Sequence, residues 1–141
     1  MNPSRAGYVL GYAGLLPFVA ALVLALLPGH AQLQALGYKA FLYYGAVILS
    51  FLGGVRWGAA MRAPSAKALS LAVAPSLIAF LILLLPSSYA IQFNALLFLT
   101  LGTFDVLKPR TPDWPLWYRT LRTHLTGAVV GLHAVFIWLA P

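Results

Sequence analysis

Few side chains in this sequence have the chemistry of a catalyst or a ligand. The 141 residues include two acids, three histidines and no cysteine. The histidines are His30, His124 and His133, and the last two stand nine residues apart, on opposite faces of one helix. The sequence therefore lacks a pair of facing axial histidines and a His/Cys cluster, and we expect no metal and no cofactor.

The two acids, Asp105 and Asp113, do not complete an enzyme site. Asp105 faces basic groups, and Asp113 lies in a stretch rich in proline and tryptophan that is typical of a membrane interface. Ser–His–Asp chemistry would need one of these carboxylates. The sequence also has no HExxH motif and no glycine-rich loop that would cradle phosphate. We therefore predict no catalytic residues and a protein that is not an enzyme.

Polar side chains do gather near one end of the apolar segments. Arg56 lies about one turn from the end of its segment and Asp105 ends another, so the two share a depth and can pair. We predict a polar vestibule whose members are Tyr8, Tyr12, Arg56, Asp105, Arg122 and His124. A structural Arg–Asp pair is the simplest interpretation, and a site for an anionic or quinone-like headgroup is the alternative.

A second polar stripe lies deeper in the apolar segments. Its members are Asn94, Thr126 and His133. Ionisable groups within membrane spans often mark relays, so a proton or ion path is a third interpretation. That path requires these three side chains to line water.

The composition decides where these residues must sit. Hydrophobic residues make up 62% of the chain and charged residues 8%, whereas an average soluble domain is roughly a quarter charged. A soluble domain, a disordered chain and a disulfide-stapled module are therefore excluded. The net charge of +7 does not indicate nucleic acid, because the basic residues flank long uncharged runs.

Charges and prolines divide the chain into membrane spans. The predicted spans are 7–27, 40–60, 69–85, 89–105 and 122–140. Continuous apolar runs favour helices over β-barrel strands, which alternate polar and apolar residues. We therefore predict an all-α polytopic membrane protein, a single domain that is a bundle of five transmembrane helices.

The basic residues also predict an orientation. With the N-terminus inside and the C-terminus outside, only Lys39 lies on the outer side. The other eight lie at the inner ends: Arg5, Arg56, Arg62, Lys67, Lys108, Arg110, Arg119 and Arg122. This asymmetry follows the positive-inside rule and suits an anionic inner leaflet. We expect a multi-pass protein of the cell inner membrane.

Small residues at a spacing of three or four predict the faces through which the helices pack. They are Gly7, Gly11 and Gly14 in the first span, Ser50, Gly54 and Gly58 in the second, and Gly127 and Gly131 in the fifth. Arg56 lies two residues from Gly54, about 200° around the helix. The second span should therefore contact protein on both sides, in the centre of the bundle.

Several stretches resemble a known family. Residues 44–58, with the sequence YGAVILSFLGGVRWG, resemble its core motif, and residues 74–77, 83–86 and 117–122 together with Asp105 are also similar. The family is the transmembrane protein 69-like, domain-of-unknown-function 3429 family of small bacterial inner-membrane proteins. The resemblance covers most of the chain. It implies a helical inner-membrane protein and supplies neither an activity nor a catalytic residue.

These observations together favour a non-enzymatic role. We expect an integral membrane protein that acts through helix packing, as a small subunit, assembly factor or stabiliser of a membrane complex. Its partners would be the bilayer and either a membrane protein or a second copy of the chain, and not nucleic acid. The alternative is a binder or carrier of a lipid, a quinone, a small solute or an ion that uses the vestibule around Arg56 and Asp105.

Overall fold

The computed structural model describes residues 2–107 and 114–140, apart from the side chain of Ser88. Within these residues the secondary structure is entirely helical, so the all-α prediction is confirmed. The helices are α1 (Pro3–Ala13), α2 (Leu16–Ala25), α3 (Ala31–Ala60), α4 (Ala66–Ile82), α5 (Ser87–Leu107) and α6 (Leu116–Leu139).

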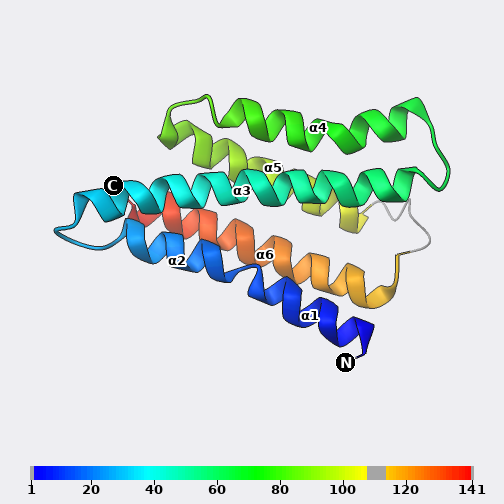
Figure 1. Cartoon of the computed structure of the whole chain (residues 1–141), viewed down its shortest axis with the longest axis horizontal. Helices are drawn as coiled ribbons and strands as arrows, with labels where there is room; N and C mark the ends of the chain where they lie inside the picture. The colour runs from blue at the N-terminus through cyan, green and yellow to red at the C-terminus, as the bar shows by residue number, and fades with distance from the viewer. Residues whose placement is uncertain (1, 108–113, 141) are drawn as a thin grey trace.

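The first predicted span is a broken helix, not a continuous one. Asn2 caps α1 by accepting a hydrogen bond from the Ser4 amide at 3.2 Å. The helix stops at Ala13, and α2 begins three residues later in nearly the same direction (Figure 1). Pro17 explains the break, because its ring clashes with the carbonyl four residues earlier and it has no amide proton to donate.

Helix α3 is much longer than its predicted span and lies in the centre of the molecule. It has 30 residues and begins nine residues before position 40. A helix of that length is about 45 Å long, which exceeds the roughly 30 Å of a bilayer's hydrocarbon core. Its early start follows a tight turn at Gly29, whose φ of 77° is one that glycine adopts without strain.

The remaining helices begin earlier than predicted. Ser65 caps α4 by accepting a hydrogen bond from the Ala68 amide at 3.2 Å. Helix α6 begins at Leu116, six residues before the predicted span. Pro115 occupies its cap position in an extended conformation, and Asp113 lies outside the described residues.

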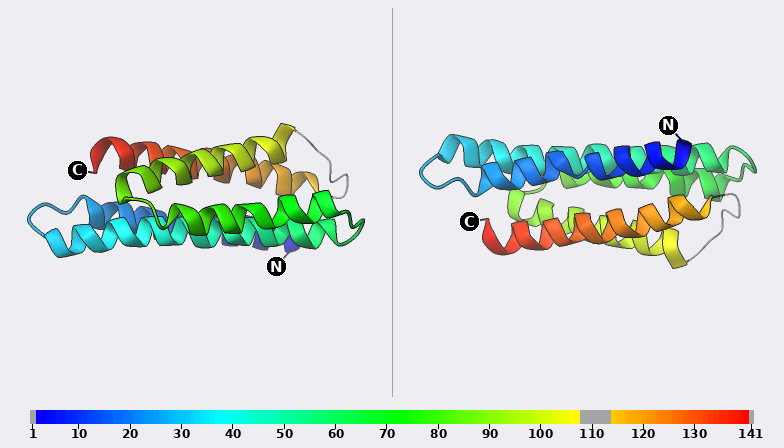
Figure 2. Two further views of the ribbon diagram at one scale, coloured as in Figure 1. Left: turned by 90° about the horizontal axis from the view of Figure 1, so that it is seen from above. Right: turned by 90° about the horizontal axis from the view of Figure 1, so that it is seen from below.

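The helices form two layers. Helix α3 lies between α2 and α4 in one layer, and α5 and α6 pack side by side in the other (Figures 1 and 2). Helices α4 and α5 are close at the turn that joins them and separate toward their other ends (Figure 2). The central position of α3 agrees with the prediction from Arg56.

Aromatic rings fill the core where the layers meet. Phe18, Phe41 and Phe136 are almost completely buried, and the ring centroids of Phe41 and Phe136 are 4.3 Å apart. The outside is also apolar: the exposed fraction is 71% for Leu10 and 86% for Trp138. Such a surface is unfavourable in water and ordinary in lipid.

Three helical segments of the described chain are long and apolar enough to cross a membrane. They are residues 3–25, which combine α1 and α2, then α3, and residues 89–107 of α5. Helix α4 is apolar but has only 17 residues. Helix α6 has 24 residues, and basic residues occupy its first half. Five crossings are therefore not established by helix length and composition.

Candidate functional site

A buried ionic cluster joins three helices at one end of the molecule. Asp105 of α5 accepts a hydrogen bond through Oδ1 from Arg56 Nη2 of α3 at 2.5 Å. Its Oδ2 accepts two from Arg122 of α6, from Nε at 3.2 Å and from Nη2 at 3.1 Å. The exposed fractions of these side chains are 14% for Arg56 and 7% for each of the others. We call these three residues the Arg–Asp–Arg triad.

The triad makes further contacts with its surroundings and carries a net positive charge. Arg56 Nη2 also donates to the Leu101 carbonyl at 3.3 Å, and its guanidinium lies 5.0 Å from the centroid of the Phe104 ring. Tyr118 lies one turn before Arg122 in α6, N-terminal to the predicted span 122–140. Burial raises the pKa of the Tyr118 hydroxyl, so this phenol remains neutral. Two guanidinium groups face one carboxylate, and the triad therefore carries a net positive charge.

Three other predicted vestibule residues form a separate cluster. The Tyr12 hydroxyl and His124 Nδ1 are 2.8 Å apart, and Tyr8 stacks on Tyr12 with ring centroids 6.1 Å apart. His124 follows Arg122 by two residues, so the two side chains point to nearly opposite faces of α6. The prediction of one vestibule is therefore wrong: α6 separates an exposed aromatic cluster from the buried triad.

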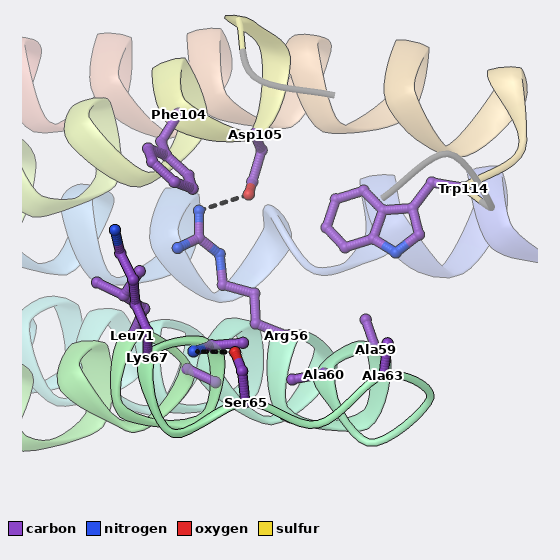
Figure 3. Close-up of a pocket in the computed structure, with 12 residues that line it drawn as sticks. Arg56, Ala59, Ala60, Ala63, Ser65, Lys67, Leu71, Phe104, Asp105 and Trp114 are labelled. Carbon is purple, nitrogen blue, oxygen red and sulfur yellow. Dashed lines mark hydrogen bonds and ion pairs between the residues drawn. The ribbon is translucent and has the colours of Figure 1, made fainter. Parts of the chain in front are cut away.

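A cavity of about 300 Å³ lies beside the triad, between α3, α4 and α5. Arg56 and Asp105 border it on one side and Lys67 on another, with Trp114 at its edge (Figure 3). The rest of the lining is mostly apolar, from alanines of α3 and α4 together with Leu71 and Phe104. The triad is therefore mostly packed by protein and also borders a partly open space.

The deeper polar residues lie inside the core. Asn94 donates through Nδ2 to the Leu42 carbonyl at 3.4 Å, and His133 Nδ1 lies 2.8 Å from the Val129 carbonyl. The rings of Phe18, Phe41 and Phe98 pack around His133. Among the described residues, Asn94 Oδ1, Thr126 Oγ1 and His133 Nε2 find no hydrogen-bond partner. His133 is thus enclosed by aromatic rings, a setting unlike the water-lined path that we considered.

The predicted packing glycines of the first span do lie at close contacts. Added Cβ atoms at Gly7 and Gly11 would meet Trp117 and Leu121 of α6. The carbonyl of Gly14 accepts a hydrogen bond from the Tyr44 hydroxyl at 2.9 Å. These glycines therefore let the first helix approach α6 and α3.

The other predicted packing positions do not pack within this chain. Added Cβ atoms at Gly54, Gly58, Gly127 and Gly131 would meet nothing within 4 Å, and Ser50 is exposed. The prediction is wrong for contacts inside the bundle, because these residues lie on the outward faces of α3 and α6.

Other glycines make the close approaches instead. Gly37, Gly45 and Gly53 all face neighbouring helices from α3. Added Cβ atoms would lie 2.6 Å from Asn94 Nδ2 at Gly45 and 2.7 Å from the Ala72 carbonyl oxygen at Gly53. Gly102 of α5 packs against Thr126 of α6 in the same way. The three α3 glycines meet three different helices, α2 at Gly37, α5 at Gly45 and α4 at Gly53, because a spacing of eight residues turns about 80° around the helix at each step.

The described residues offer no metal centre, since no three of their His, Cys, Asp and Glu side chains come together. The long apolar helices, the lipid-like outer surface and the buried ionic cluster define a class, the helical membrane-type proteins.

Comparison with known proteins identifies the family. The chain belongs to the family described as "Protein of unknown function (DUF3429)", which matches residues 3–138. It is similar to Transmembrane protein 69 of Xenopus tropicalis, with 37% identity over 136 residues that cover 91% of this chain and 51% of the relative. The chain thus spans about half the length of that relative. No solved structure gives a significant match. The family resemblance found in the sequence is therefore confirmed.

Proposed function

We propose that the protein is a multi-pass protein of the cell inner membrane with five crossings, α1 with α2, then α3, α4, α5 and α6. The described chain starts at one end of the molecule and finishes at the other, which suits an odd number of crossings (Figure 1). Arg56, Lys67 and Arg122 cluster at the end where α1 begins, and this end would face the cytoplasm. The N-terminus is then inside and the C-terminus outside.

The proposed role is non-enzymatic: a small subunit, assembly factor or stabiliser of a membrane complex. The observation that carries this role is the pair of outward glycine faces, Gly54 with Gly58 on α3 and Gly127 with Gly131 on α6. Within the described chain no side chain approaches these four positions, and the close contacts between helices of the bundle are made at other glycines. Small outward residues let a helix of a membrane protein, or of a second copy, approach closely.

Chemical crosslinking in membranes, followed by purification in mild detergent, tests this role. The wild-type chain should be recovered in a crosslinked species larger than the monomer. Gly54→Leu and Gly127→Leu should lose that species and remain folded, because both positions are open within the chain. Gly29→Leu is not a suitable control because of its positive φ, whereas Ala20→Leu is an exposed substitution on α2, outside both glycine faces. Recovery of the wild type only as an isolated monomer would refute the role.

A second candidate function is favoured by the cavity beside Arg56. The protein would bind a lipid, quinone, small solute or ion there. The cavity combines two cationic side chains, Arg56 and Lys67, with an apolar lining, which is an arrangement suited to an amphipathic anion. The test of this function depends on the class of ligand.

A further inference from the structure

We propose that the cavity between α3, α4 and α5 binds an anionic phospholipid of the cytoplasm-facing leaflet, with the lipid phosphate beside Arg56 and Lys67. The proposal deepens the second candidate function and rests on the proposed membrane orientation. Its argument has three steps: the charge of the cavity, its shape and its depth in the membrane.

The charge follows from how the triad shares its hydrogen bonds. Both carboxylate oxygens of Asp105 are used, Oδ1 by Arg56 and Oδ2 by Arg122. Arg122 does not line the cavity, yet it balances the Asp105 charge from the far side. Both hydrogen bonds that Arg56 makes to described residues leave from Nη2, and in the proposed complex the phosphate accepts hydrogen bonds from its other nitrogens. With Lys67 added, the described residues of the lining carry an excess of positive charge.

The N-terminus of α4 adds to this field. Ser65, whose hydroxyl caps the helix, and Lys67 in its first turn both line the cavity (Figure 3). The amide groups of a helix N-terminus carry a partial positive charge and favour phosphate. Arg56 approaches from the facing helix, so a phosphate would have cationic groups on two sides.

The shape suits a lipid better than a free anion. Helices α4 and α5 separate toward this end of the molecule (Figure 2). Ala68 and Leu71 of α4 and Phe104 of α5 line the space between them, and the exposed fractions of Leu71 and Phe104 are 47% and 37%. An acyl chain lying between these side chains would be covered on two sides and remain continuous with the bilayer.

The level of the cavity along the membrane normal agrees with the level of the lipid headgroups. Trp114 lies at its edge, and tryptophan is enriched at the level of lipid headgroups. A volume of about 300 Å³ is enough for a phosphate group and the start of one chain. The cavity is therefore placed where the phosphate of a cytoplasm-facing lipid would reach Arg56 and Lys67.

Native mass spectrometry of the detergent-purified chain tests the proposal, with phosphatidylglycerol and phosphatidylcholine as probes. We expect one phosphatidylglycerol to be retained in preference to phosphatidylcholine. Lys67→Gln should weaken its binding about tenfold, the usual effect of losing a charge-assisted hydrogen bond. Leu71→Trp, which fills the apolar side of the cavity, should also weaken it. Arg5→Gln removes an exposed cation outside the cavity and should have no effect.

Three results would overturn the proposal. One is equal retention of the two lipids by the wild type. Another is an equal loss for Lys67→Gln and Arg5→Gln, which would indicate general attraction between charges. The third is displacement of phosphatidylglycerol by inorganic phosphate with no effect of Leu71→Trp, which would indicate a free-anion site. Failure of the membrane orientation is recognised separately, by the side of the membrane from which single cysteines introduced as Ser4→Cys and Ala140→Cys are labelled.

Discussion

Arg122 donates two hydrogen bonds to a single carboxylate oxygen of Asp105, at 3.2 and 3.1 Å, and leaves the other oxygen to a second arginine. This geometry connects α5 with α6 inside one layer, while Arg56 connects that layer to α3 in the other. In water, hydrophobic burial would hold the two layers together. Here the ionic cluster joins them. In lipid, close packing and polar contacts must hold helices together.

Asp105→Ala should be the most destabilising change in the triad. It leaves two mostly buried guanidinium groups without their carboxylate, and removal of one partner from a buried pair costs about 3–5 kcal/mol. Arg56→Ala should cost less, because Arg122 still pairs with Asp105. The free energy of unfolding in mixed detergent micelles measures both changes, with Arg5→Ala as an exposed control.

The double variant Arg56→Ala/Asp105→Ala tests whether the interaction between Arg56 and Asp105 contributes to stability. It should be more stable than Asp105→Ala alone, since only one arginine is then left without a partner. If it is no more stable, the bond between Arg56 and Asp105 contributes nothing.

Two adjacent glycines of α3 should respond in opposite ways to alanine. A Cβ at Gly53 would lie 2.7 Å from the Ala72 carbonyl oxygen, so Gly53→Ala must push α4 away and should cost about 1–3 kcal/mol. A Cβ at Gly54 meets nothing within 4 Å, so Gly54→Ala should be neutral or stabilise the helix by up to about 1 kcal/mol. Thermal unfolding of the detergent-solubilised variants compares them. Equal effects of the two substitutions would contradict this rotation of α3 about its own axis.

Thr126→Val should leave stability unchanged or raise it. The Thr126 hydroxyl is buried and has no partner among the described residues, whereas its methyl group packs against Gly102. Valine preserves this shape and removes only the hydroxyl, whose burial without a hydrogen bond is unfavourable. The midpoint of thermal unfolding measures the effect. A clearly lower midpoint would reveal a hydrogen bond that holds α6 in place.

The sequence predicted the helices and one of their contacts well. Long uncharged runs were sufficient for an all-helical fold, and the common depth of Arg56 and Asp105 was sufficient to pair them. Both inferences use the position of residues along the membrane normal, which charges and chain length indicate directly. The central place of α3 was also predicted correctly, although the Gly54 face used in that argument contacts nothing within the described chain.

The rotation of each helix was harder to predict. In lipid, the outer surface is as apolar as the interior, so hydrophobic periodicity does not distinguish them. Gly53 and Gly54 are one residue apart, or 100° around α3, and the spacing of four favoured the outward one. The prediction that placed His124 with Arg122 in one vestibule had a different cause, since residues two apart lie about 200° apart on any α-helix and the sequence alone separates these two side chains. The first span was predicted as one segment, and its break before Pro17 follows from the missing amide proton of proline.

The membrane topology provides the most direct test of the central claim, that five crossings collect the cations on the cytoplasmic side. The chain has no cysteine, so a single one can be introduced at each end as Ser4→Cys and Ala140→Cys. A membrane-impermeant maleimide applied to intact spheroplasts should label Ala140→Cys at once and Ser4→Cys only after the membrane is disrupted. Labelling of both positions from the same side would contradict the account.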